Sequence, residues 1–126
     1  MDTILNLARK KQSLKVVNDQ AGCPTYVVDL AKALVELAEA DRGGIFHFCN
    51  GPACTWYEFA KKIVEIAGLP CKIEPCSTEE YPRPAKRPKY SVLDCSKTYE
   101  VLGWMPRSWE DRVKDYIGIS KESVGA

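Results

Sequence analysis

Hydrophobic residues recur at intervals of three and four along several stretches, which predicts amphipathic helices there. The first covers residues 1–12, the second residues 26–40, and the third opens at Thr55. Thr25 is the expected N-cap of the second helix, because a threonine hydroxyl accepts a hydrogen bond from a free backbone N–H. The face of that helix expected to be buried consists of Val27, Leu30, Ala31, Leu34, Leu37 and Ala38.

The third helix has the clearest boundaries in the chain. Thr55 and Glu58 have the three-residue spacing of a capping box, and Gly68 ends the helix. Two shorter helices are predicted near the C-terminus, one over residues 96–102 and one from Ser108 to about Tyr116. We expect a frayed tail over residues 118–126.

Short extended segments lie between these helices. They cover residues 14–17, 44–49, 71–75 and 90–94, whereas residues 77–89 hold too many prolines and cations for regular structure. Strands that alternate with helices predict a mixed α/β (α+β) fold, with short strands packed against about five helices. We expect residues 1–126 to form a single domain.

The composition excludes several classes of function. Of 126 residues, 45% are hydrophobic and 28% charged, and 18 Lys and Arg against 17 Asp and Glu leave a net charge of +1. Such a balance offers no field for a polyanion, so we expect no nucleic-acid partner. Apolar runs are too short for a membrane span and there is no signal-peptide pattern, which favours a cytoplasmic protein without a membrane partner.

Six cysteines allow three interpretations. Disulfides require an oxidising compartment, and a zinc site would use the two C-x4-C pairs with His47. His47 lies in an apolar run that predicts a buried strand, so we expect no metal ligand there. Reduced, mostly buried thiols are the favoured interpretation. The cysteines are Cys23, Cys49, Cys54, Cys71, Cys76 and Cys95.

Tyr57 and Lys61 have the spacing of the Tyr/Lys pair of short-chain dehydrogenases, in which the lysine lowers the tyrosine pKa for proton transfer. That chemistry needs a nicotinamide held by a glycine-rich turn, and no G-x-G-x-x-G stands in this chain. Both residues also lie in a helix that its capping box already explains. We therefore assign no catalytic residue.

Two segments carry candidate binding chemistry. Residues 18–29 form a polar loop that leads into a helix N-terminus, where free N–H groups suit an anionic or hydroxyl-rich ligand. Residues 81–94 hold four cations among three prolines, and an arginine there can grip a phosphate with two hydrogen bonds. The alternatives are a plain strand-to-helix connection for the first segment and a solvated basic loop for the second.

Three stretches resemble one family. They are VVNDQAGCPTYVVDLAKAL, GIFHFCNGPACTWYEFAKKIVEIAG and EEYPRPAKRPKYSVLDCSKTYEVLGW. Together they are similar to the C-terminal, substrate-binding portion of the dTDP-4-dehydrorhamnose reductases, which are extended short-chain dehydrogenases. The resemblance runs from about residue 4 to residue 116.

This resemblance implies a partner and an activity. Members reduce dTDP-4-dehydro-L-rhamnose to dTDP-L-rhamnose with NAD(P)H, using a Rossmann portion and a Thr/Tyr/Lys set upstream of the matched region. We expect this chain to lack that portion, to bind no cofactor alone and to be inactive alone, which leaves open whether it is an enzyme. A nucleotide sugar is the implied ligand.

The resemblance also implies a set of substrate-binding residues. An arginine at the position of Arg87 contacts the diphosphate in related enzymes, and the loop at residues 20–25 lies near the substrate. The implied set is Arg87, Gln20, Gly22, Pro24, Thr25, Lys86 and Tyr90.

One alternative from a different class remains. The regulatory beta subunit of methionine adenosyltransferase is similar to these reductases and works by binding a partner, so this chain could be a non-catalytic interaction module. In either case we expect an exposed apolar surface that meets the Rossmann portion or a second copy of the chain.

Overall fold

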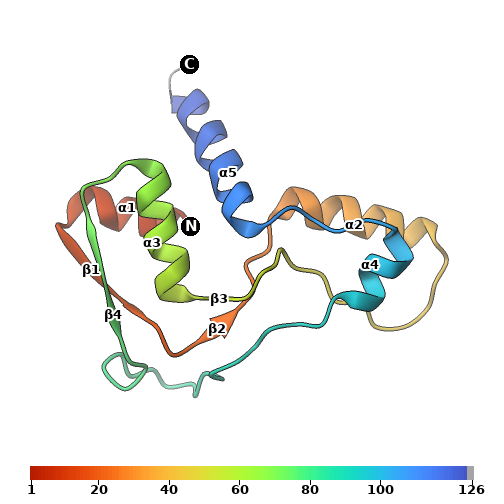
Figure 1. The fold of residues 1–126 in the computed structure, drawn as a ribbon, viewed down its shortest axis with the longest axis horizontal. Coiled ribbons are helices and arrows are strands. Elements are labelled where there is room, and N and C mark those ends of the chain that lie inside the picture. Colours follow the sequence, from red (N-terminus) through yellow and green to blue (C-terminus); the bar gives the residue numbers. More distant parts are fainter. Residues whose placement is uncertain (125–126) are drawn as a thin grey trace.

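The computed structural model describes the backbone of residues 1–124 and the side chains of residues 1–119. This part of the chain forms five helices and four short strands, which confirms the mixed α/β class (Figure 1). The elements are α1 (Asp2–Lys10), β1 (Ser13–Val17), β2 (Ala21–Gly22), α2 (Val27–Glu39), β3 (Cys54–Thr55), α3 (Trp56–Ala67), β4 (Lys72–Cys76), α4 (Ser96–Leu102) and α5 (Trp109–Val124).

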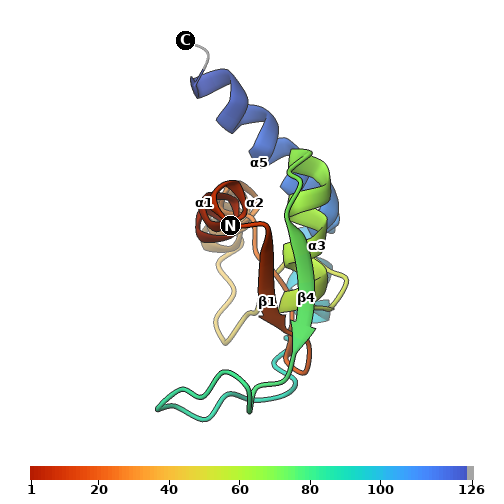
Figure 2. The same cartoon turned by 90° about the vertical axis from the view of Figure 1, so that its left-hand side faces the viewer.

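One end of the molecule is built on a parallel strand pair, β1 and β4, with Ser13 opposite Lys72 and Val17 opposite Cys76 (Figure 2). Helix α3 packs on both strands and against α1 and α5. The apolar core lies between these helices and buries Ile63 completely. Its buried members are Leu5, Cys54, Phe59, Ile63, Trp109, Val113 and Ile117.

Helix α3 begins and ends as its sequence predicts. The Thr55 hydroxyl accepts a hydrogen bond from the Glu58 N–H at 3.2 Å, and the Thr55 N–H donates to the Glu58 carboxylate at 2.7 Å. Gly68 closes the helix in the left-handed conformation, with φ 66°. The capping box is thus confirmed on both of its hydrogen bonds.

The other end of the molecule consists of α2, α4 and the loop between α2 and β3. A polar network joins α2 to α5 there. The Arg112 guanidinium donates to both carboxylate oxygens of Asp29, at 2.6 and 2.8 Å. The fully buried Asn50 amide donates to Asp29 at 2.7 Å and to the Arg107 carbonyl at 2.9 Å.

The structure corrects the prediction for α2. Tyr26, not Thr25, is the N-cap, and no side chain caps the helix. The face predicted to be buried lies largely open, with Val27 70% and Leu34 59% exposed. Leu30 and Leu37 are half-buried, and Ala31 and Ala38 are exposed. The buried residues of the helix are Ala33 and Asp29, and Asp29 is held by hydrogen bonds from Asn50 and Arg112.

Three other expectations also change. Residues 44–49 form no strand and His47 is exposed, because this segment meets α4 through side chains and not through a strand ladder. Residues 90–94 contribute only an isolated bridge at Tyr90. Helix α5 continues past Tyr116 to Val124, so residues 118–124 of the expected tail are helical and residues 125–126 lie outside the described part.

Candidate functional site

The two segments with candidate binding chemistry lie side by side. The Ala21 N–H donates to the Lys89 carbonyl at 2.8 Å, and the Ser91 N–H donates to the Ala21 carbonyl at 2.9 Å. On its other side β2 pairs with β3, with Gly22 opposite Cys54. The backbone therefore holds residues 20–22 between residues 77–89, which we call the basic loop, and the start of α3.

The backbone approaches the Ser91 side chain closely at Gly22. A Cβ on Gly22 would lie 3.1 Å from the Ser91 hydroxyl oxygen, which is tighter than ordinary side-chain contacts. The Ser91 hydroxyl also donates to the Ala21 carbonyl at 3.2 Å. A side chain at position 22 would therefore require the Ser91 hydroxyl to shift by a few tenths of an ångström.

A second set of hydrogen bonds, made by Thr78, fixes the start of the basic loop. Both the Thr78 N–H and its hydroxyl donate to Asp19, the hydroxyl at 2.6 Å, and the Gln20 amide donates to the Thr78 hydroxyl at 3.0 Å. These hydrogen bonds hold the pKa of the Asp19 carboxyl below its usual value, with a smaller contribution from Lys89. The loop is thus tied at both ends to residues 19–21.

A cleft of about 1220 Å³ opens between this clamped loop, β1 and the start of α3. One wall carries cations from the loop and the other carries backbone and polar groups of residues 15–22. All side chains of residues 81–90 are exposed. The lining residues that bear polar or aromatic chemistry are Lys15, Asp19, Gln20, Trp56, Thr78, Glu79, Tyr81, Arg83, Lys86, Arg87, Lys89 and Ser91.

The cations of this wall are available to a ligand. Arg83 lies over the Tyr81 ring, 6.0 Å from its centroid. Within the described residues, no side chain forms an ion pair or hydrogen bond with Lys86 or Arg87. An arginine in this state can offer two parallel N–H donors to a phosphate, and neighbouring prolines reduce the conformational freedom lost on binding.

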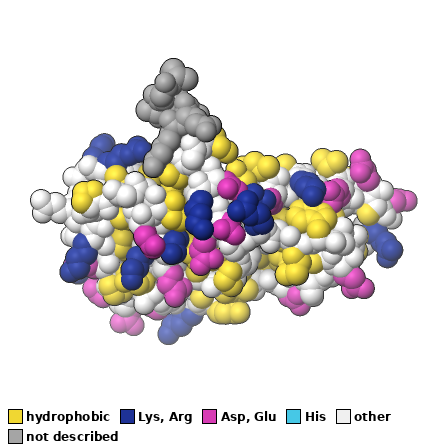
Figure 3. All heavy atoms as spheres, turned by 45° about the horizontal axis from the view of Figure 1, so that its top comes forward, with side chains coloured by type: hydrophobic (Ala, Val, Ile, Leu, Met, Phe, Trp, Pro, Cys, Tyr) yellow, Lys and Arg dark blue, Asp and Glu magenta, His cyan; other side chains and the backbone are white. Residues whose placement is uncertain are grey.

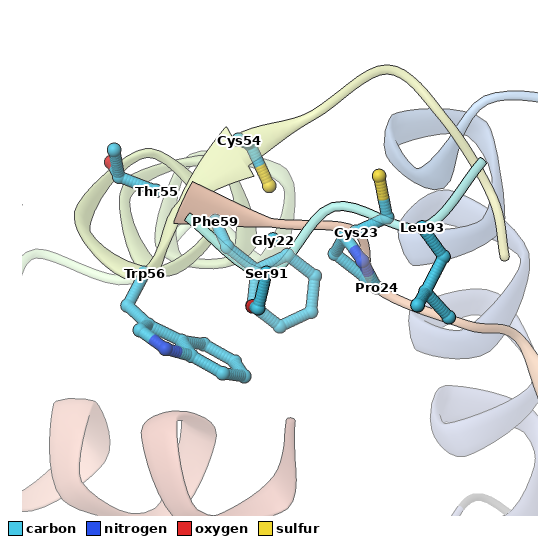
Figure 4. Close-up of a pocket in the computed structure, with 9 residues that line it drawn as sticks. All are labelled: Gly22, Cys23, Pro24, Cys54, Thr55, Trp56, Phe59, Ser91 and Leu93. Atoms are coloured by element: carbon cyan, nitrogen blue, oxygen red, sulfur yellow. The ribbon is translucent and has the colours of Figure 1, made fainter. Parts of the chain in front are cut away.

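A smaller pocket of about 120 Å³ (Figure 4) shares Gly22, Trp56 and Ser91 with the cleft. Its walls are mostly apolar, and Trp56 projects into it from the first position of α3. Trp56 is 53% exposed and meets Phe59 edge-on, with 6.2 Å between the ring centroids. Phe59 in turn packs on Trp109 in the core, so the exposed indole of Trp56 is supported by two buried aromatic side chains.

The structure brings some of the predicted site residues together and separates others. Gln20, Gly22, Lys86 and Arg87 line the large cleft. Pro24 lines the small pocket, and its carbonyl accepts a hydrogen bond from the Asn50 N–H at 2.9 Å. Thr25 and Tyr90 line neither cavity, although Tyr90 holds the loop through its bridge to Ala21.

Trp56 is the feature of the site that sequence reasoning missed. It lines both cavities, yet in the sequence it reads as part of the capping box of α3. Its position at the start of a helix gives no signal of exposure, because Trp109 is likewise the first residue of α5 and is only 5% exposed.

Cysteine and metal chemistry also bear on the site. All six cysteines are free, and five are buried while Cys23 is half-buried, which confirms the expectation of mostly buried thiols. In the described part of the chain, no group of three or more His, Cys, Asp and Glu residues is arranged to hold a metal ion. None of the described helices is long and apolar enough to cross a membrane.

Comparison with known proteins defines the class of this fold. A dTDP-4-dehydrorhamnose reductase structure from Clostridium acetobutylicum superposes with a TM-score of 0.89 at 41% identity, over 95% of this chain and 43% of that one. The reductase from Bacillus anthracis, solved in complex with NADP, superposes with a TM-score of 0.81 at 36% identity, over 90% of this chain and 40% of that one. The fold is therefore that of a portion of the extended short-chain dehydrogenases.

Residues 1–121 match the family model of the RmlD substrate binding domain, and the chain belongs to this family. The spore coat polysaccharide biosynthesis protein SpsK of Bacillus subtilis is 44% identical over 117 residues, which cover 93% of this chain and 41% of SpsK. The chain thus spans about two fifths of the length of the relatives that it matches.

Proposed function

We propose that this chain binds the nucleotide-sugar substrate of a dTDP-4-dehydrorhamnose reductase, the enzyme that reduces dTDP-4-dehydro-L-rhamnose to dTDP-L-rhamnose with NAD(P)H. The observation that carries the proposal is the cleft in which Arg87 and Lys86 face residues 15–22. A diphosphate needs clustered cations that have no carboxylate partner of their own, and this wall offers them.

Each proposed residue has a distinct role. Arg87 binds the diphosphate with two hydrogen bonds, and Lys86 adds a mobile positive charge beside it. Gln20 and the backbone at Gly22 form the opposite wall, which suits the hydroxyl groups of a sugar. Pro24, Thr25 and Tyr90 act on the ligand indirectly by shaping the loop, since Thr25 and Tyr90 line neither cavity.

The hydride transfer is the step that we do not assign to this chain. We infer that residues outside this chain bind NAD(P)H and donate the proton, and that the chain alone reduces nothing. Tyr57 and Lys61 lie on α3, which the capping box and the core account for. The contribution of Arg87 and Lys86 to catalysis would be to hold the substrate diphosphate while the ketone is reduced.

The test is an NMR titration of the isotopically labelled 126-residue chain with dTDP. We expect saturable shifts in residues 20–22 and 83–90. In the Arg87→Ala variant the dissociation constant should rise about tenfold or more, because a charge-assisted pair of hydrogen bonds is lost. Arg42→Ala is the matched control, since Arg42 is an exposed arginine that lines neither cavity.

Two results would contradict the proposal. One is a well-folded chain whose spectrum does not change with dTDP, which would favour the non-catalytic interaction module. The other is equal weakening by Arg87→Ala and Arg42→Ala, which would mean that only net charge matters.

We also infer that the open face of α2 is an association surface, for the rest of a reductase or for a second copy of the chain. Val27, Leu34 and Val35 are each more than half exposed along it, and such a run of apolar side chains favours burial. Sedimentation should show concentration-dependent self-association in the micromolar range, weakened by Leu34→Lys. A stable monomer throughout that range would contradict self-association.

A further inference from the structure

We propose that Trp56 is the surface on which the base of the bound nucleotide stacks, so that this chain binds the base as well as the diphosphate. The inference rests on the proposed function, because it concerns the same cleft and the same ligand. Trp56 and Arg87 both line that cleft, and Trp56 also lines the small pocket that shares residues with it. A nucleotide that fills the cleft therefore meets both the cations and the indole.

The ring of Trp56 is open to a planar ligand. The residue is more than half exposed. Within the basic loop, Arg83 lies over the ring of Tyr81. No such cation–ring contact forms at Trp56 among the described residues, although Trp56 lines the same cleft as the cations of the loop. An open aromatic face beside a positively charged wall suits the two parts of a nucleotide, a flat base and a charged diphosphate.

Hydrogen bonds fix the start of α3, and with it the indole, against the wall of the cleft. The pairing of β2 with β3 places Ala21 opposite Thr55, the residue before Trp56. The Thr55 hydroxyl donates to the side-chain carbonyl of Asn18 at 2.8 Å. The Trp56 ring is also supported edge-on by Phe59. Because the indole is already held in place, little conformational freedom is lost when a ligand binds to it.

The polarity of the walls indicates which part of a nucleotide sugar meets Trp56. A hexose is rich in hydroxyl groups and needs hydrogen-bond partners, and Gln20 and Thr78 bring polar side chains to the cleft. Trp56 instead adjoins Phe59 and Leu93 in the small pocket, whose walls are mostly apolar (Figure 4). The faces of a base need no hydrogen bond and stack on aromatic rings. The base therefore fits beside Trp56 better than the hexose does.

This contact would give the chain a particular kind of selectivity. Stacking on an aromatic side chain is tolerant of base identity, because every base has a flat π face. We therefore expect Trp56 to favour a nucleotide over a bare diphosphate without selecting one base over another. The cations of the basic loop, in contrast, act on any ligand that carries a diphosphate.

The test compares two ligands, dTDP and inorganic pyrophosphate, which is a diphosphate without a base. Each is titrated into the isotopically labelled chain, and NMR gives the dissociation constants. Trp56→Ala should raise the dissociation constant of dTDP about tenfold or more, because a stacking contact is lost. The same variant should leave the dissociation constant of pyrophosphate unchanged. Arg87→Ala should weaken the binding of both ligands.

Two further variants and one spectroscopic signal separate stacking from a structural role. Trp56→Phe keeps an aromatic face and should recover most of the dTDP affinity. Tyr57→Ala is the matched control, because Tyr57 is the next aromatic residue of α3 and lines neither cavity. In the unaltered chain, the indole N–H signal of Trp56 should shift with dTDP and stay in place with pyrophosphate. Circular dichroism confirms that each variant is folded before affinities are compared.

The possible failures are distinguishable. A folded chain that binds neither dTDP nor pyrophosphate overturns the proposed function, and the stacking role with it. A chain that binds both ligands but keeps its dTDP affinity in Trp56→Ala overturns the stacking role alone. Equal weakening of dTDP and pyrophosphate by Trp56→Ala also overturns the stacking role, since Trp56 would then only maintain the shape of the cleft.

Discussion

The two ends of this molecule are held together by different forces. At one end α1, α3 and α5 bury a continuous apolar core around Ile63. At the other end Trp104, which follows α4, donates a hydrogen bond to Glu36 of α2 and stacks under Lys32, while Val27, Val35 and Ile45 stay exposed by 60% or more. Figure 3 shows hydrophobic side chains in open view over the α2 and α4 end.

This difference teaches what an amphipathic pattern does and does not reveal. Both α2 and α3 have an apolar face of helical period, yet the face of α3 is covered and that of α2 is largely open. Periodicity shows that a helix has a face suited to burial, but not which surface covers it. The polar network around Asp29 explains why α2 keeps its place without that cover.

The largest change in the free energy of unfolding should come from truncating a side chain in the apolar core. Ile63→Ala should lower the free energy of unfolding by about 2–5 kcal/mol, because it removes buried methyl groups and leaves a cavity in a fully enclosed site. Leu34→Ala, the matched truncation on the open face of α2, should change it by no more than about 0.5 kcal/mol. Urea unfolding of the two variants measures both values.

Comparable losses at the two positions would contradict this view. They would mean that α2 is covered in solution by a second copy of the chain. Repeating the unfolding at several protein concentrations tests for this second copy, because only an associated chain gains stability with concentration.

The next largest loss of stability is expected from breaking the polar network around Asp29. Asp29→Ala should cost about 2–3 kcal/mol, because it leaves Arg112, which is largely buried, without its main partner. Asp115→Ala removes a second, more exposed partner of the same guanidinium and should cost less than about 1 kcal/mol. Thermal or urea unfolding of both variants gives the comparison. An Asp29→Ala chain as stable as the Asp115→Ala chain would show that packing, not this network, anchors α2.

Most of the element order could be predicted from the sequence, because the signals involved are local. The capping box at Thr55, the glycine stop at Gly68 and the strand at residues 14–17 all depend on neighbours within a few positions. The network around Asp29 joins residues 21 and 83 positions apart, and no local pattern announces it. For the same reason His47 was expected in a core strand that does not form.

The candidate site divides in the same way. The basic loop and the loop at residues 20–25 could each be recognised from composition. Their pairing through Ala21, Lys89 and Ser91 could not, since backbone hydrogen bonds between distant segments leave no mark on side-chain type. The outward position of Trp56 was missed because its helix start already had a structural explanation.

A smaller effect separates the two threonines expected to cap helices. Thr55→Ala should cost about 1 kcal/mol, since its hydroxyl satisfies a free N–H at the start of α3. Thr25→Ala should leave stability nearly unchanged, because the N-cap of α2 is Tyr26 and no side chain caps that helix. Urea unfolding tests both. A cost for Thr25→Ala that equals the cost for Thr55→Ala would restore Thr25 as a cap.

The smallest effect is a local acid transition at the base of the basic loop. Hydrogen bonds from Thr78, first from its side chain and then from its backbone, lower the pKa of Asp19 beneath its ordinary value of 3.8. A lowered pKa in the folded state means that the stabilising contribution is fully present above the ordinary pKa and is lost as pH falls through the lower, folded value. The amide signal of Thr78 should therefore move only below about pH 4, and it should stay constant with pH in Asp19→Asn. If the variant shows the same acid transition, a group other than Asp19 anchors the start of the loop. The Thr78–Asp19 hydrogen bonds would then not be what positions Arg87 at the cleft.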